Sequence, residues 1–176
     1  IANAIVGVAK ERAKPEGERA PTFTESAIAR TRTQLAEETP ISADLEEIRL
    51  GFWLSKTREY LTVDNANVKN LLGRESPEGL AERAVQNTRL DEPAYRAAAI
   101  DMTPEQLTAL NDPMIDLAMR NYDAAAAVRA EWNAKVAAPT ARAAERIAQA
   151  RFGVYGDQQY PDATFSLRLS YGTVQG

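Results

Sequence analysis

Residues 112–136, DPMIDLAMRNYDAAAAVRAEWNAKV, decide the fold class of this 176-residue chain. Apolar or small side chains recur every three to four residues for about six turns, which is the spacing of one helix face. The stripe consists of Met114, Leu117, Ala118, Asn121, Ala125, Val128, Trp132 and Val136. Asp112 and Pro113 supply a helix start. We therefore predict a long helix here, within a mainly α chain.

Pro139 follows this helix and cannot donate a backbone hydrogen bond to the preceding turn, so we expect a kink or a break there. Helical spacing resumes over residues 140–151. The inward positions are then Ala143, Ile147 and Ala150. Unbroken, residues 112–151 would extend about 60 Å at 1.5 Å per residue, longer than a small domain is wide. We interpret this segment as an arm that returns toward another domain.

The chain before residue 112 has the pattern of several shorter helices. Their starts are marked by a capping serine, threonine or asparagine, by proline at the first helical position, or by an early acid. The predicted ranges are 1–13, 24–38, 43–61, 65–72, 77–87, 93–99 and 103–110. Because these units share no fixed period, a solenoid is rejected and an irregular multi-helix domain is expected.

Residues 43–61 form the most apolar of these predicted helices. Apolar side chains cover well over half of its circumference at 100° per residue. They are Leu45, Ile48, Leu50, Phe52, Trp53, Leu54, Tyr60 and Leu61. We therefore expect this helix to be central. Phe52 and Trp53 could line a ligand pocket, but a core position is favoured for both.

Composition excludes several classes of function. The net charge of −4 and the pI near 5.1 argue against a general nucleic-acid binder, which needs a basic field. No stretch approaches the roughly 20 apolar residues of a membrane-spanning helix. The chain has no Cys and no His, so neither a Ser–His–Asp nor a Cys–His site can be assembled from it. No Gly-rich phosphate loop is present.

Three side chains within residues 64–68 carry oxygen, as the side chains of a calcium-binding loop do. Ala66 and Val68 occupy positions that would have to coordinate the ion, so the hypothesis fails. We assign no catalytic, cofactor-binding or metal-ligating residue in this chain, and we expect no cofactor.

Residues 160–172, YPDATFSLRLSYG, form the segment with β-type alternation. Phe165, Leu167, Leu169 and Tyr171 share one face, whereas Thr164, Ser166, Arg168 and Ser170 share the other. A lone strand needs a partner for its edges. We therefore predict a C-terminal β-strand and infer that the chain is a piece of a longer protein.

Two motifs resemble bacterial dipeptidyl-peptidases of the dipeptidyl-peptidase 7 and dipeptidyl-peptidase 11 type. They are DPMIDLA at 112–118 and, more specifically, YPDATFSLRLSYGTV at 160–174. The resemblance implies a chymotrypsin-like double β-barrel with a helical domain inserted into it. Residues 1–156 would then be the later part of the helical cap domain. Residues 157–176 would be a linker and the first returning strand of the truncated barrel.

The resemblance also implies an activity for the parent protein, namely release of dipeptides from peptide N-termini by a serine nucleophile with histidine and aspartate. None of the three catalytic residues would lie in this chain, which alone would be inactive. The cap would limit access to the cleft and supply an asparagine for the substrate amine. We do not assign this role to Asn65, Asn67 or Asn121.

The implied setting of the parent is the periplasm or cell surface of a Gram-negative bacterium, with a peptide substrate and a homodimeric assembly. The alternative that the residues leave open is a stand-alone helical protein-interaction module without catalytic activity.

Overall fold

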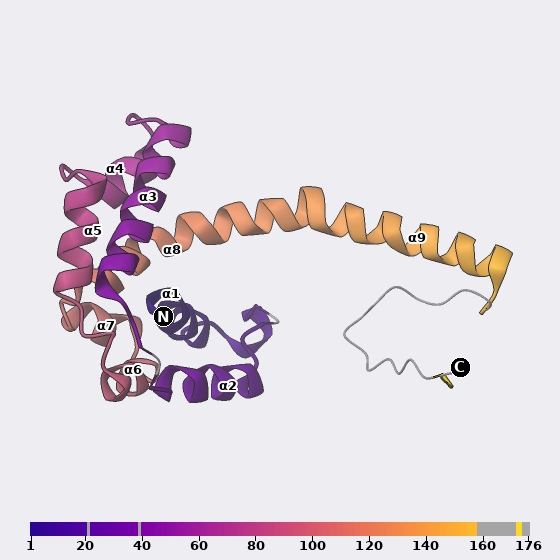
Figure 1. The fold of residues 1–176 in the computed structure, drawn as a ribbon, viewed down its shortest axis with the longest axis horizontal. Coiled ribbons are helices and arrows are strands. Elements are labelled where there is room, and N and C mark those ends of the chain that lie inside the picture. The colour runs from indigo at the N-terminus through magenta and orange to yellow at the C-terminus, as the bar shows by residue number, and fades with distance from the viewer. Residues whose placement is uncertain (21, 39, 158–171, 174–176) are drawn as a thin grey trace. The chain divides into compact units, whose positions relative to one another are not determined.

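The computed structural model of the protein describes residues 1–20, 22–38, 40–157 and 172–173, and in this part the chain is mainly helical (Figure 1). The short helices lie where the sequence predicts them. In chain order the elements are α1 (Ala2–Arg12), a 3₁₀ turn (Glu16–Glu18), α2 (Glu25–Ala36), α3 (Ala43–Leu61), α4 (Ala66–Leu72), α5 (Pro77–Gln86), α6 (Pro93–Ala99), α7 (Pro104–Ala109), α8 (Pro113–Trp132), a π-helical segment (Asn133–Ala137) and α9 (Ala138–Tyr155).

The strand predicted at residues 160–172 lies outside the described residues, apart from Gly172. By its contacts the chain divides into two compact units, Ile1–Val128 and Arg129–Gly176. The domain boundary expected after residue 156 stays a prediction.

The helix starts show why these segments are helical. The side chains of Ser42 and Ser76 accept hydrogen bonds from the amides of Leu45 and Gly79, as the sequence predicts for capping residues. Thr103 forms a reciprocal capping box with Gln106 at the start of α7. Prolines occupy the first positions of α5, α6 and α7, where a missing N–H costs nothing.

Unit Ile1–Val128 contains two apolar clusters. The larger one combines α1, α2, α6, α7 and the start of α8; its fully buried members include Ile5, Val6, Ile28, Ile100 and Ile115. The second cluster joins α3, α4 and α5 through Leu54, Leu71 and Leu80, with Leu117 of α8. Helix α8 therefore contributes to both clusters from opposite sides.

A buried arginine joins two of the loops around the larger cluster. Arg96 of α6 is 2% exposed. Its guanidinium donates to the carbonyls of Leu35 and Glu37 at 2.7 Å each, and to those of Leu90 and Asp91 at 2.9 Å each. The first two carbonyls belong to the end of α2, where helical acceptors lack partners. Arg96 therefore ties the end of α2 to the α5–α6 connection.

A buried carboxylate makes the corresponding junction at α8. Asp112 is the residue before the helix, and it accepts hydrogen bonds from the Met114 and Ile115 amides in the first turn. It also accepts from the Thr88 hydroxyl at 2.9 Å and from the Arg89 amide at 3.1 Å. One aspartate thus caps α8 and fixes the α5–α6 connection against it.

Glu11, at the end of α1, is the third buried charged residue in the described part of the chain. It accepts hydrogen bonds from the Ala20 amide, the Lys14 ammonium and the Tyr122 hydroxyl. Burial by itself raises the pKa of Glu11, but these three donors outweigh it and hold the pKa below its ordinary value. The carboxylate thereby links α1 to α8 and to the loop that follows α1.

Helical hydrogen bonding continues past residue 132 in a different form. The Ala138 amide donates to the Asn133 carbonyl, which is an i to i+5 bond, and Pro139 lies in the first turn of α9. The chain thus stays helical through Pro139, without the break that the sequence predicts, and the π-helical segment ends two residues before the proline.

The predicted inner stripe of the long helix is correct only at its start. Leu117 and Ala118 are buried, whereas Val128, Trp132 and Val136 are exposed. The positions expected to be inward on α9, Ala143, Ile147 and Ala150, are exposed as well. Periodicity marks a helix face that is suited to burial. The described part of neither unit provides a surface that covers the later residues of this face.

We predict that Arg96→Met lowers the free energy of unfolding by about 3 kcal/mol or more, because four carbonyls lose their donor inside the protein. Arg96→Lys should lose less, since an ammonium keeps part of the hydrogen bonding. Arg49→Met is the matched control, because Arg49 is an exposed residue paired with Glu46, and such pairs contribute about 1 kcal/mol or less. Urea unfolding followed by circular dichroism measures all three. An Arg96→Met protein as stable as wild type would contradict the assigned role.

We further predict that Glu11 contributes to acid sensitivity. Its pKa is depressed in the folded state, so its contribution is present above the unfolded value, near 4.5, and is lost as pH falls through the folded value. The stability difference between wild type and Glu11→Gln should therefore be largest near neutral pH and shrink as pH falls below that value. Glu82→Gln, at an exposed position of α5, is the control. A difference that stays constant with pH would rule out this linkage.

Candidate functional site

We first looked in the described residues for clusters of metal-ligating side chains and for membrane-spanning helices. Within the residues that the structure describes, no three His, Cys, Asp or Glu side chains lie together so as to hold a metal ion. In the same part of the chain, no helix has the length and apolar character needed to cross a bilayer. The candidate functional features are therefore a cavity and two exposed helix faces.

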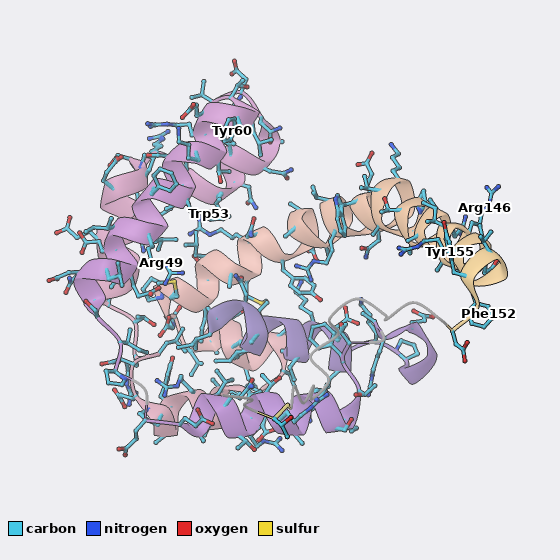
Figure 2. All side chains as sticks on the ribbon, turned by 45° about the vertical axis from the view of Figure 1, so that its right-hand side comes forward. Arg49, Trp53, Tyr60, Arg146, Phe152 and Tyr155 are labelled. Carbon is cyan, nitrogen blue, oxygen red and sulfur yellow. The ribbon has the colours of Figure 1, made fainter. Side chains whose placement is uncertain are left out.

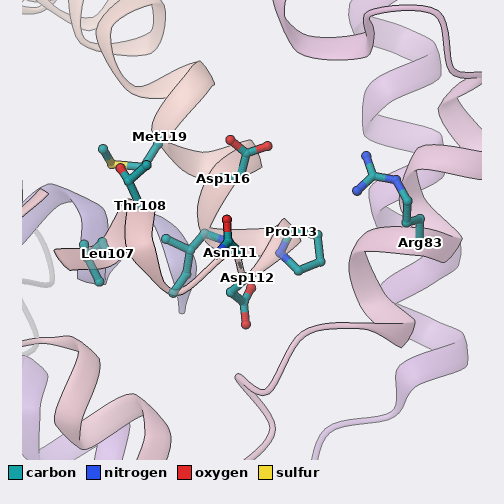
Figure 3. Close-up of a pocket in the computed structure, with 9 residues that line it drawn as sticks. Arg83, Leu107, Thr108, Asn111, Asp112, Pro113, Asp116 and Met119 are labelled. Atoms are coloured by element: carbon teal, nitrogen blue, oxygen red, sulfur yellow. Dashed lines mark hydrogen bonds between the residues drawn. The ribbon is translucent and has the colours of Figure 1, made fainter. Parts of the chain in front are cut away.

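A cavity of about 250 Å³ lies where α7 turns into α8, facing α5 (Figure 3). Arg83 of α5 stands on one side of it, and the α7–α8 junction forms the other. The buried side chains of Leu107 and Ile115 are apolar parts of the lining. Asn111 has a φ of 53°, a conformation that asparagine tolerates and that allows the tight turn between the two helices.

The polar groups of this cavity already have partners. Arg83 forms two hydrogen bonds with Glu75, at 2.8 and 2.6 Å. The arginine contact holds the pKa of Glu75 below its ordinary value. Asp116 forms an ion pair with Arg120 at 3.0 Å, and the Asn111 amide donates to the Ala109 carbonyl. We therefore interpret this cavity as a structural junction, because its charges are compensated within the protein.

One side of α3 is a more prominent feature (Figure 2). Five large apolar side chains project from it, with exposed fractions between 42% for Trp53 and 76% for Tyr60. They are Leu45, Ile48, Phe52, Trp53 and Tyr60. At 100° per residue they occupy roughly 140° of the helix circumference, a single continuous stripe. We call this set of five residues the α3 face.

Two cations lie within the α3 face. The Lys56 ammonium is 5.9 Å from the centre of the Phe52 ring and 5.8 Å from that of the Tyr60 ring, which are cation–π distances. Lys56 also pairs with Glu59 at 2.7 Å, and Arg49 pairs with Glu46 at 3.0 Å. The face is therefore apolar and aromatic, with its local charge balanced.

The α3 face overturns the prediction that this helix is central and that Phe52 and Trp53 are core residues. The buried residues of α3 are Gly51 and Leu54, which lie on the opposite side. A Cβ added at Gly51 would meet the Cβ of Ala81 at 3.6 Å, so the glycine allows α5 to approach closely. Helices α4 and α5 cover this side of α3, and the α3 face is left exposed in the described part of the chain.

Helix α9 carries the second exposed face. Ile147, Phe152, Val154 and Tyr155 are each more than half exposed, and none of the residues of α9 is buried. Figure 2 shows Phe152 and Tyr155 near its end together with Arg146.

The three asparagines that were compared with the amine-binding asparagine of the family lie on α4, at its start and on α8. Asn65 caps α4 by accepting a hydrogen bond from the Asn67 amide at 2.9 Å. Asn67 is exposed on α4, and Asn121 is half-buried on α8. That none of the three holds a substrate amine stays a prediction.

Comparison with known proteins now places the chain. All of it, residues 1–176, matches the family described as Peptidase S46. A relative is the Asp/Glu-specific dipeptidyl-peptidase of Shewanella putrefaciens, 28% identical over 184 residues. That alignment covers 99% of this chain but 25% of the relative, so the chain spans about a quarter of the relative's length. On the family match over its whole length, the chain belongs to the S46 peptidase family.

Proposed function

We propose that this chain is the non-catalytic helical part of a serine-type dipeptidyl-peptidase, in which it forms a cap that limits access to the active-site cleft. The observation that carries the proposal is the family match over residues 1–176, together with a dipeptidyl-peptidase relative of which the chain covers a quarter. The parent would release dipeptides from peptide N-termini. Its serine, histidine and aspartate would lie outside residues 1–176.

The composition of the chain supports a non-catalytic role. The sequence has no histidine, which is the base of the triad that a serine peptidase of this type uses. The buried charged residues Glu11, Arg96 and Asp112 each have several hydrogen-bond partners within the fold. These contacts support a structural role for all three.

We further propose that the parent protein is located in the periplasm or at the cell surface of a Gram-negative bacterium. It would act on peptide substrates and form a homodimer. Residues 1–156 would then belong to the helical cap, and residues 157–176 would lead into the peptidase barrel as its first returning strand.

A second candidate function is supported by one specific observation. The α3 face exposes Phe52, Trp53 and Tyr60, and aromatic residues of this kind are enriched at protein interfaces. A stand-alone helical module that binds a partner protein would use such a surface. It would need no further part of a peptidase.

We predict that the 176-residue chain does not hydrolyse chromogenic dipeptide substrates, including those with an acidic second residue, whereas the longer natural polypeptide does. A serine-directed phosphonate should inactivate the longer polypeptide, and mass mapping should place the modified serine outside residues 1–176. Turnover by the 176-residue chain, or essential modification of a serine within it, would contradict the proposal. A longer polypeptide without dipeptidyl-peptidase activity would instead favour the interaction module.

A further inference from the structure

The π-helical segment Asn133–Ala137 is the place where the hydrogen bonding of the long helix changes. At its end the Ala138 amide donates to the Asn133 carbonyl, five residues back, whereas α-helical bonds reach four residues back. Pro139 lies two residues after the segment and has no N–H to donate to the preceding turn. Two weaknesses in the backbone hydrogen bonding therefore fall within residues 133–139.

Pro139 differs from the prolines that begin α5, α6 and α7. Those prolines occupy the first position of a helix, where a missing N–H costs nothing. Ala137 and Ala138, which precede Pro139, already have helical backbone angles. The missing N–H of Pro139 therefore leaves a carbonyl of the previous turn without its helical donor. Kinks in long helices occur mainly at prolines and at π-helical turns, and this stretch combines both.

Side chains add little to the stiffness of this stretch. None of the residues from Asn133 to Tyr155 is buried, so the described residues provide no core contact that holds the helix straight. The ion pair of Lys135 with Glu131 at 2.5 Å bridges the segment and the end of α8, but both side chains are mostly exposed, and such pairs contribute little. Helical hydrogen bonds are thus the main restraint on this part of the chain, and they are weakest within residues 133–139.

We propose that residues 133–139 form a hinge at which α9 changes direction relative to residues 129–132, the end of α8. Regular helical bonding on either side confines the bend to this one site. Both flanking stretches belong to unit Arg129–Gly176, so the hinge is a property of that unit. It lets the exposed apolar side chains of α9 meet a covering surface at more than one angle. The hinge does not depend on the proposed function, because it requires no enzymatic activity.

Pulsed electron paramagnetic resonance between two spin labels tests the hinge. The sequence has no cysteine, so labels attach only at cysteines that are introduced. One label replaces the exposed Tyr60 of α3. The other replaces either Gln149, beyond the segment, or Ala127, before it, as the matched control; both positions are exposed. A bend of about 20° moves residue 149, about 20 Å beyond the segment, by about 7 Å.

We expect the distances to position 149 to be spread by about this amount and those to position 127 to be narrowly distributed. Pro139→Ala restores an amide donor, so it should narrow the first distribution and leave the second unchanged. Equal widths at the two positions would overturn the proposal. A broad distribution that persists in Pro139→Ala would also overturn it, because unwinding of α9 rather than a hinge would then spread the label.

Discussion

The buried guanidinium of Arg96 is the interaction on which unit Ile1–Val128 depends. It satisfies four backbone carbonyls from two loops that are distant in sequence, near residues 35–37 and 90–91. Asp112 then fixes the second of these loops to the start of α8. Short helices have little surface with which to hold one another, so polar side chains that bind loop backbone define their arrangement. Glu11 extends the same principle to α1 and Tyr122.

Much of the helical layout could be predicted from the sequence because its signals are local. Ser76 with Pro77, and Thr103 with Pro104, mark helix starts by chemistry that acts within one turn. The role of Arg96 could not be predicted, because an arginine in PAYRAAA looks like an ordinary solvated charge. Two of its four acceptors, the carbonyls of Leu35 and Glu37, lie about 60 residues away in the chain. Pro139 marked the change in the long helix, although not its π-helical form.

The exposure of the α3 face could not be predicted from the sequence, because it depends on contacts between distant parts of the chain. The apolar residues of α3 were recognisable from periodicity, but periodicity does not reveal whether the covering partner belongs to the same chain. Phe52 and Trp53 are exposed because Gly51 and Leu54 on the opposite side take up the contact with α5. The sequence contains neither histidine nor cysteine, so a Ser–His or a Cys–His pair cannot form within these 176 residues.

Membership of the S46 peptidase family gives these surfaces a context. We propose that residues 1–176 are the helical part of a longer enzyme and that polypeptide outside them covers the exposed faces of α3 and α9. Amide hydrogen exchange of α9, compared between the 176-residue chain and the longer natural polypeptide, tests this claim most directly. We expect fast exchange over residues 138–155 in the chain and slow exchange in the longer polypeptide, with α1 slow in both. Equally slow exchange of α9 in both proteins would contradict it.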